Sequence, residues 1–289
     1  MSLGIQAQVQ CEDTCQHVHG IDLSHYQGNV FWETVGDNSK MAYVYLKATE
    51  GATNVDSKYK QNIDLAHRYG LKVGSYHFYR ARIPQQTQLK NFMAQCRPGD
   101  QDLLPMIDVE TKSNLPTEEF CDSLFKFLHL VEKAYKQKPL VYTGANFYDN
   151  YLLGKLNSYK IMIAQYSKRE PVLRDGRDIE MWQYTGKGRL NGVNGYVDKS
   201  RFMGKHKLRE IRFRHQKEEK PAGSDLRFSE RRSAQRTYGY HRRNRHGPAQ
   251  GILQDLRKTG KRNRRRAGMA RKSRSESQRL CADSASENP

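Results

Sequence analysis

Between residues 18 and 198, short apolar runs alternate with amphipathic or turn-rich stretches. Runs rich in β-branched and aromatic residues are typical of strands, and the amphipathic stretches between them are typical of helices. Eight runs can be counted, at residues 17–22, 42–48, 72–79, 103–110, 139–143, 161–166, 180–185 and 195–198. Eight strands that alternate with helices predict an α/β fold of the TIM-like barrel type.

The helical signals are concentrated in the first part of the chain. A helix is predicted over residues 57–69, where Gly70 would end it, and a second helix after Pro116, where acidic residues suit a helix N-terminus. Apolar residues of the second helix recur at helical spacing, so one face should pack on the core. The last connections are short and rich in glycine. We therefore expect an irregular barrel that is closed on one side by strands alone.

The charge of the chain is unevenly distributed. Residues 1–213 carry 29 Lys+Arg and 23 Asp+Glu, a net +6, whereas residues 214–289 carry 21 and 8, a net +13. Apolar periodicity ends at about the same point, and such a composition cannot bury enough apolar surface to fold. We expect an N-terminal extension over residues 1–17, a barrel over residues 18–210, and a basic low-complexity tail over residues 211–289 that is disordered.

The cysteines and the hydropathy argue against a disulfide-rich scaffold, a zinc protein and a membrane-spanning protein. The five cysteines are too scattered for a disulfide scaffold; they are Cys11, Cys15, Cys96, Cys121 and Cys281. A bridge between Cys11 and Cys15 is one option. No zinc-like spacing occurs, so neither a metal nor another cofactor is expected. No run of 18 apolar residues predicts a membrane span, and the first ten residues do not have the pattern of an intact signal peptide.

Acidic residues stand at several predicted strand ends, where a parallel barrel places its reactive groups. They are Asp22, Asp108, Glu110 and Asp198. Asp108 and Glu110 are separated by one residue on an extended strand, so they share a face with Cα atoms roughly 6.6 Å apart. Crowding raises the pKa of one of two such carboxyls and keeps a proton available, as glycoside hydrolysis requires. Glu110, nearer the barrel mouth and longer, is the predicted proton donor.

Each of these residues also has an ordinary structural interpretation. Taken alone, Asp22 or Asp198 would be a turn or capping residue, and His77 a hydrogen-bonded barrel residue. The strand aromatics alone would belong to the core; they are Tyr76, Tyr79, Tyr142, Tyr166, Trp182 and Tyr184. Their joint placement at strand ends favours a sugar site, because sugars bind on flat apolar faces next to polar groups.

The ordered motifs resemble glycoside hydrolase family 25, the lysozymes of the Chalaropsis and phage-endolysin type. The resemblance covers residues 18–208 and is carried by eight segments. These are GIDLSHYQG from Gly20, KATEG from Lys47 with NVD from Asn54, GSYHFY from Gly74, PMIDVE from Pro105, VYT from Val141, AQY from Ala164, WQY from Trp182 and VD from Val197.

The resemblance implies an N-acetylmuramidase on a barrel of five β/α units and three closing strands. It would hydrolyse the β-1,4 bond between N-acetylmuramic acid and N-acetylglucosamine in peptidoglycan. Carried over by position, Glu110 is the general acid, Asp108 assists it, and Asp22 and Asp198 flank the pair. The implied substrate-binding residues are Tyr76, His77, Tyr142, Gln165, Tyr166, Trp182, Gln183 and Lys47. The spacing of the carboxyls is compatible with both retention and inversion.

The remaining alternatives concern the substrate and the tail. A chitinase-like hydrolase would need Asp at positions 103 and 106, where Leu103 and Met106 stand. A non-catalytic wall-binding barrel is the other alternative, although all four acids are retained. The tail could bind anionic wall polymers or nucleic acid, or serve no dedicated role. We expect a monomer that acts on peptidoglycan outside the cell or at the wall, after secretion or phage release.

Overall fold

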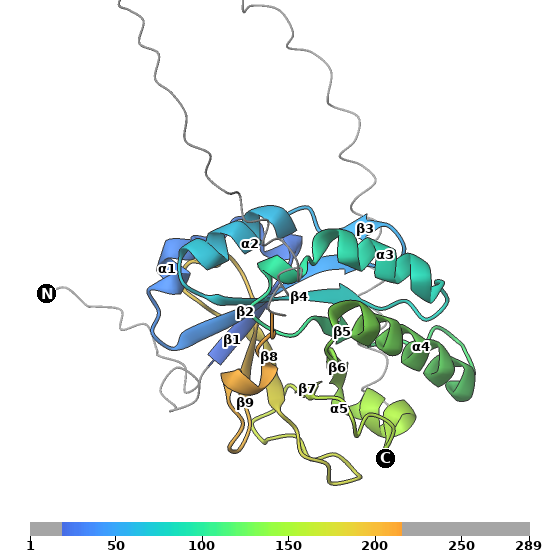
Figure 1. Ribbon diagram of the computed structural model, residues 1–289. Helices are drawn as coiled ribbons and strands as arrows, with labels where there is room; N and C mark the ends of the chain where they lie inside the picture. Colours follow the sequence, from blue (N-terminus) through green and yellow to red (C-terminus); the bar gives the residue numbers. More distant parts are fainter. Residues whose placement is uncertain (1–18, 216–289) are drawn as a thin grey trace, which may run out of the picture. The chain divides into compact units, whose positions relative to one another are not determined.

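The centre of the protein is a closed barrel of eight strands (Figure 1). The computed structural model describes residues 19–215. The strands run in the order β1-β9-β8-β7-β6-β5-β4-β2, and β2 pairs back to β1. They are β1 (His19–Leu23), β2 (Met41–Glu50), β4 (Lys72–Phe78), β5 (Met106–Asp108), β6 (Leu140–Gly144), β7 (Ile161–Ala164), β8 (Met181–Gly188) and β9 (Val197–Phe202). Each corresponds to a run predicted from the sequence, so the barrel is confirmed.

A helix follows each of the first five barrel strands. The helices are α1 (Trp32–Gly36), α2 (Tyr59–Arg68), α3 (Gln85–Gln95), α4 (Thr117–Tyr135) and α5 (Ala145–Phe147). Short helical turns add η2 (His25–Gln27), η3 (Pro98–Asp100), η4 (Tyr148–Leu152) and η5 (Leu208–Ile211), and a two-residue strand, β3 (Asn54–Val55), pairs antiparallel with the end of β2. Helix α4 buries one apolar face, as predicted.

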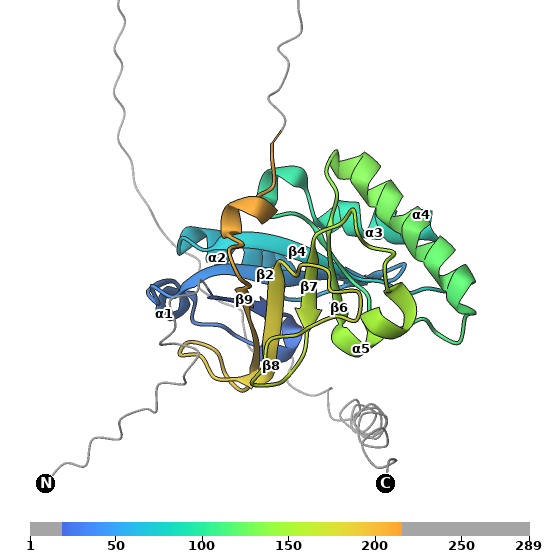
Figure 2. The same ribbon diagram turned by 90° about the horizontal axis from the view of Figure 1, so that it is seen from below.

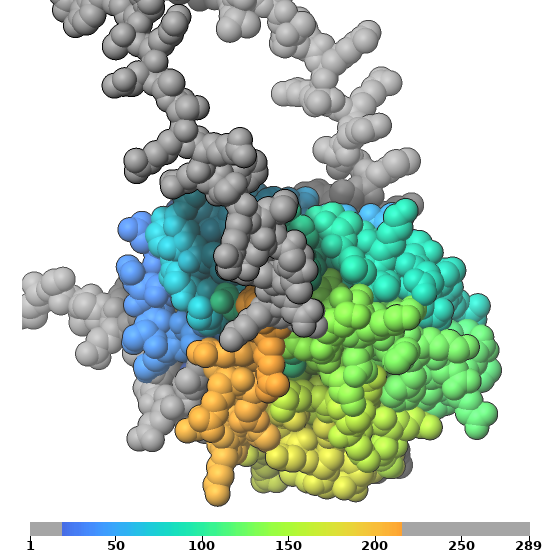
Figure 3. Space-filling model, viewed as in Figure 1, coloured from blue at the N-terminus to red at the C-terminus, as the bar shows by residue number. Residues whose placement is uncertain are grey.

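The other side of the barrel is closed by strands. Between β7 and β9 the described chain forms no helix, and β9 runs antiparallel to both β8 and β1. Figure 2 shows α3 and α4 on one side of the barrel and β8 and β9 on the other. In the space-filling view, α3 and α4, in teal and green, form one continuous surface (Figure 3). The prediction of an irregular barrel with five β/α units and three closing strands is confirmed.

Alternate residues of each strand face opposite sides, which produces two apolar layers. One fills the space between barrel and helices. The other fills the barrel interior, and its main members are Tyr43, Tyr45, Leu103, Leu104, Met106, Leu140, Tyr142, Met162, Met181, Phe202 and Ile211. The two tyrosines need glycine beside them: a Cβ at Gly20 would lie 2.0 Å from the Tyr43 ring, and one at Gly74 would lie 2.3 Å from the Tyr45 ring.

The packed chain continues past the predicted barrel boundary at residue 210. Ile211 is fully buried in the barrel interior, and its carbonyl accepts a hydrogen bond from the Leu104 N–H at 2.8 Å. The Phe213 N–H donates to the Asp102 carbonyl at 2.8 Å. Ile211 and Phe213, which alternate with arginines in the sequence, are therefore packed against the barrel.

Several expectations fall outside the described residues. They are the extension over residues 1–17, a bridge between Cys11 and Cys15, and the disorder of the chain from residue 216 onward. Within the described part, Cys96 and Cys121 are buried free thiols. No helix of residues 19–215 is long and apolar enough to cross a membrane.

Candidate active site

The four predicted carboxylates converge at one end of the barrel. Asp108 is the last residue of β5, and Glu110 follows two residues later. Asp22 lies near the end of β1, directly opposite Asp198 in the antiparallel ladder with β9. Asp198 therefore begins an antiparallel strand, whereas the sequence had suggested the end of a strand. Because β9 runs the other way, its first residues lie where the parallel strands finish.

Asp108 and Glu110 form an interacting pair. Burial raises the pKa of Asp108 well above its usual range. The charge of Glu110 and a hydrogen bond between the two carboxyls raise the pKa of Asp108 further. Asp108 is buried, whereas Glu110 is exposed at the mouth. Protein atoms crowd Glu110 enough for the loss of solvation to raise its pKa as well, although the hydrogen bond and two nearby cations oppose that rise. The pair can thus keep a proton at a higher pH than an ordinary carboxyl, and Glu110 is the accessible member.

Asp22 and Asp198 add two more carboxyls with raised pKa values. Burial raises the pKa of Asp22 to about 8, opposed by a hydrogen bond from Gln183 and aided by the charge of Asp198. Burial, with the charge of Glu110, raises the pKa of Asp198 to about 6. Within the described chain, Oδ1 of Asp22 and Oδ1 of Asp108 are buried without a hydrogen-bond partner. Buried polar atoms rarely stay unpaired, so both oxygens keep unused hydrogen-bonding capacity.

Gln183 links the carboxylates to two tyrosines. Its Nε2 donates to Asp22 Oδ2 at 2.8 Å, and its Oε1 accepts from the hydroxyls of Tyr142 and Tyr166, each at 2.9 Å. Tyr166 is 62% exposed, which leaves its ring open to a ligand. A Cβ at Gly186 would come within 3.2 Å of that ring, so glycine permits this approach.

Tyr76 and Lys47 complete the predicted residues that border the carboxylates. The two are partners in the β2–β4 ladder. Burial, followed by the charges of Asp108, Asp22 and Asp198, raises the pKa of Tyr76 well above its usual range. The charge of Lys47 lowers the pKa values of Asp108 and Glu110. Both side chains therefore lie close enough to the acids to affect them electrostatically.

Three predicted binding residues have no described contact with the four carboxylates. His77 is fully buried, bonded to Thr49 and Gln88, with its ring against Phe92 and Phe127. It follows Tyr76 along β4, so it points to the opposite face, towards α3 and α4.

Trp182 and Gln165 also make their described contacts with residues other than the carboxylates. Trp182 precedes Gln183 on β8 and so faces outward, where its Nε1 donates to the Gln165 carbonyl at 2.8 Å. The Gln165 side chain donates to Ser167 and Arg169 in the loop after β7. These contacts place His77 and Trp182 on the outer side of their strands and the Gln165 side chain in the loop after β7.

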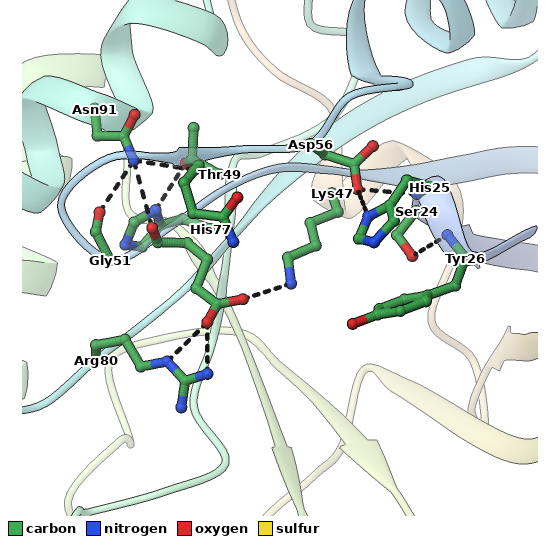
Figure 4. Close-up of polar contacts among 12 residues, drawn as sticks. Ser24, His25, Tyr26, Lys47, Thr49, Gly51, Asp56, His77, Arg80 and Asn91 are labelled. Atoms are coloured by element: carbon green, nitrogen blue, oxygen red, sulfur yellow. Dashed lines mark hydrogen bonds and ion pairs between the residues drawn. The ribbon is translucent and has the colours of Figure 1, made fainter. Parts of the chain in front are cut away.

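The sequence analysis named Lys47 but not the two residues that bind with it in a charged cluster, Glu50 and Arg80 (Figure 4). Lys47 Nζ donates to Glu50 Oε2 at 2.7 Å, and Arg80 donates to Glu50 Oε1 from Nε at 3.0 Å and from Nη2 at 2.5 Å. Burial would raise the pKa of Glu50, but the hydrogen bonds and charges of Lys47 and Arg80 hold it below its usual range. Glu50 and Arg80 stand at strand ends, so the rule that identified Asp22 would have found them.

A second omission is an aromatic side chain on the loop after β1. Tyr26, in η2, is 80% exposed and is held by its backbone contact to Ser24 (Figure 4). The loop is fixed by Asp56, whose Oδ2 accepts from the His25 N–H at 2.9 Å, and by Ser24, whose Oγ accepts from the Tyr26 N–H at 3.3 Å. An exposed ring on a fixed loop is a typical platform for a sugar.

Comparison with known proteins identifies the family. The family model described as glycosyl hydrolases family 25 matches residues 21–193, which include Asp22, Asp108 and Glu110. The chain belongs to glycosyl hydrolase family 25. This family 25 chain is therefore a glycoside hydrolase, and its irregular barrel is the fold of its family.

Relatives of known sequence and structure agree with that assignment. The family 25 chain is 33% identical over 191 residues to the uncharacterized protein YegX of Escherichia coli, covering 65% of this chain and 70% of the relative. It is 33% identical over 184 residues to an autolytic lysozyme of Clostridium acetobutylicum, covering 63% and 55%. A family 25 glycosyl hydrolase structure from Bacillus anthracis matches with a TM-score of 0.60 and 31% identity, covering 65% and 89%.

Proposed function

We propose that this protein is a lysozyme, an N-acetylmuramidase that hydrolyses the β-1,4 bond between N-acetylmuramic acid and N-acetylglucosamine in bacterial peptidoglycan. The observation that carries the proposal is the Asp108–Glu110 pair, in which both pKa values are raised and only Glu110 is exposed. The lysozyme among the relatives supports the choice of substrate.

Glu110 is the general acid. Cleavage of a glycosidic bond requires a proton on the leaving oxygen as the bond to the sugar carbon breaks. A carboxyl that keeps its proton to a higher pH, and that a ligand can reach, meets this requirement. The shorter and buried Asp108 assists Glu110: its carboxylate stabilises the positive charge that develops on the sugar ring, or orients the 2-acetamido group.

The other residues of the mouth bind the glycan. Asp22 accepts a hydrogen bond from Gln183 and so fixes the amide group that holds the two tyrosines. Tyr166 supplies an open ring for the apolar face of a sugar, and Tyr142 is held beside it through Gln183. Tyr76 and Asp198 border the same space.

The cellular setting follows from the substrate. We place the enzyme outside the cell or at the wall, acting as a monomer whose barrel needs no partner chain to complete the carboxylate cluster. The basic segment beyond residue 215 would bind anionic wall polymers through its excess of Lys and Arg. Nucleic-acid binding by that segment is the competing function, and it would be steeply salt-dependent.

The experiment is digestion of purified peptidoglycan by wild type, Glu110→Gln and Asp108→Asn, with mass spectrometry of the released fragments. Wild type should release muropeptides with new N-acetylmuramic acid reducing ends. Glu110→Gln keeps the shape but cannot donate a carboxylic proton, so turnover should fall by roughly 100-fold or more, and Asp108→Asn should also be severely impaired. Glu33→Gln, an exposed change on α1, is the matched control and should leave turnover unchanged.

The same digestion distinguishes the alternatives. Reducing ends of N-acetylglucosamine, or cleavage of chitin in preference to peptidoglycan, would identify a chitinase-like specificity. Full activity of Glu110→Gln would show that another group donates the proton. Binding without any release by wild type, over several wall types, would identify a wall-binding protein.

A further inference from the structure

The mouth of the barrel contains cations as well as acids. The Arg80 guanidinium lies 4.5 Å, and Lys47 Nζ 5.2 Å, from the centroid of the Phe78 ring. Phe78 pairs with Asp108 in the β4–β5 ladder and with Glu50 in the β2–β4 ladder. We call Lys47, Arg80 and Phe78 the cationic shelf. Its position next to Asp108 is fixed by strand pairing.

The cationic shelf carries excess positive charge. Glu50 binds both cations, and its lowered pKa keeps it ionised, so two positive charges are set against one negative charge. Arg80 uses Nε and Nη2 on Glu50, and within residues 19–215 its Nη1 has no protein acceptor. The Arg80 side chain is 42% exposed. The free N–H groups on one edge of the guanidinium can therefore donate hydrogen bonds to an anion from solution.

The cationic shelf also lies close to Glu110. Arg80 and Lys47 are the cations whose charges lower the pKa of Glu110. A sugar held against Glu110 would thus present its substituents to these side chains. The carboxyls around it are acceptors or neutral acids and supply no positive charge, so the shelf is the favourable place for a negatively charged substituent.

The structure assigns to the cationic shelf the binding of a carboxylate on the muramoyl side of the substrate. This inference rests on the proposed function and extends it to specificity. N-acetylmuramic acid differs from N-acetylglucosamine by a 3-O-lactyl group, whose carboxylate is free when the peptide stem is absent. With the stem attached, the lactyl carboxyl is in amide linkage, and the carboxylates that remain free in the stem supply the same chemistry. Polymers of N-acetylglucosamine alone have neither, so Arg80 and Lys47 select against them.

The test measures binding, so that it does not depend on catalysis. Glu110→Gln and Glu110→Gln/Arg80→Gln are titrated with stem-free glycan of alternating N-acetylglucosamine and N-acetylmuramic acid. They are also titrated with stem-bearing glycan, and with both glycans after conversion of their carboxylates to methylamides. Glu110→Gln should bind the carboxylate form about 10-fold more tightly than the amide, and Arg80→Gln should abolish that preference while leaving amide binding unchanged. A preference on stem-free glycan identifies the lactyl carboxylate, and one confined to stem-bearing glycan identifies the stem.

Arg82→Gln is the matched control. Arg82 lies two residues after Arg80 in the sequence and donates to the Ser113 carbonyl. Its replacement should therefore change neither the affinity for the carboxylate glycan nor that for the amide glycan. The inference is overturned if Arg80→Gln weakens both glycan forms equally, or if Glu110→Gln shows no preference for the carboxylate. Hydrolysis by wild type is measured separately. A carboxylate preference without hydrolysis would refute the proposed activity and leave the assignment of the shelf intact.

Discussion

Replacing Asp22 with Asn should make the protein more stable near neutral pH while reducing hydrolysis. Burial raises the pKa of Asp22 from 3.8 to about 8 in the folded protein. Between these values the folded protein holds a proton that the unfolded chain has released. Rising pH therefore favours unfolding, by about 1.4 kcal/mol per pH unit for one such group. From pH 4.5 to pH 7 the loss is roughly 3 kcal/mol.

Asn removes this titration with little change of shape. Its side-chain oxygen can still accept the hydrogen bond from Gln183 Nε2, which now reaches Asp22 Oδ2 at 2.8 Å. At pH 4.5, where Asp22 is neutral in the folded state, the two proteins should differ by less than about 1 kcal/mol. At pH 7 the variant should be the more stable by roughly 3 kcal/mol.

The assay is urea unfolding of wild type and Asp22→Asn at intervals from pH 4.5 to pH 8. The difference between the two proteins is the quantity to follow, because His77 acts in the opposite direction. Burial lowers the pKa of His77 from 6.5 to about 4, so its contribution to stability rises with pH over that range and cancels in the difference. Asp64→Asn, an exposed change on α2, is the control and should show no such trend.

A difference that stays constant with pH would refute the reasoning. It would mean that Asp22 ionises in the folded protein as readily as in the unfolded chain. Burial in this cluster would then not raise the pKa of a carboxyl. The argument that burial keeps a proton on the Asp108–Glu110 pair would be weakened, because it relies on the same cause.

Three further outcomes test the packing around the site. Gln183→Met should leave buried hydroxyl and carboxyl groups unpaired and lower the unfolding free energy by about 2–4 kcal/mol, and it should raise the pKa of Asp22 further in the same pH series. A chain ended after residue 215 should melt at the temperature of the full chain, whereas Ile211→Ala within it should cost about 2–5 kcal/mol in urea unfolding. Gly74→Ala should lower the melting temperature because the new Cβ would meet an aromatic ring at 2.3 Å, whereas Gly99→Ala, with open space around it, should not.

The barrel could be predicted because its strands and helices alternate with clear periods. The acids could be proposed because three of them lie at or just after the ends of parallel strands, where Glu110 follows Asp108 by two residues. The direction of the last strand was not predictable. Asp198 reaches the site because β9 is antiparallel, and no local feature of its few residues specifies direction.

The inner and outer faces of the strands could not be told apart from sequence. In a half-exposed sheet the alternation of polar and apolar residues distinguishes the faces, but the strands of a β/α barrel are buried on both. Along β4 the sequence GSYHFY places polar and aromatic residues on each face. Tyr76 turns to the barrel interior and His77 to the helices, so the two neighbours face opposite sides of the strand. The same holds on β8, where Trp182 faces outward and the next residue, Gln183, faces the carboxylates.

The position of the site is a consequence of where the inner rows of side chains stop being apolar. On β5 the inner row runs from Met106 to Asp108, and on β2 it runs from Tyr45 to Lys47. The residues that fill the barrel and those that form its mouth thus lie on the same strands, and one strand pairing positions both. A slip of one residue in β5 would turn Asp108 towards the helices. The packing that fixes the register deep in the barrel therefore also fixes the spacing of the acids and the cationic shelf at its mouth.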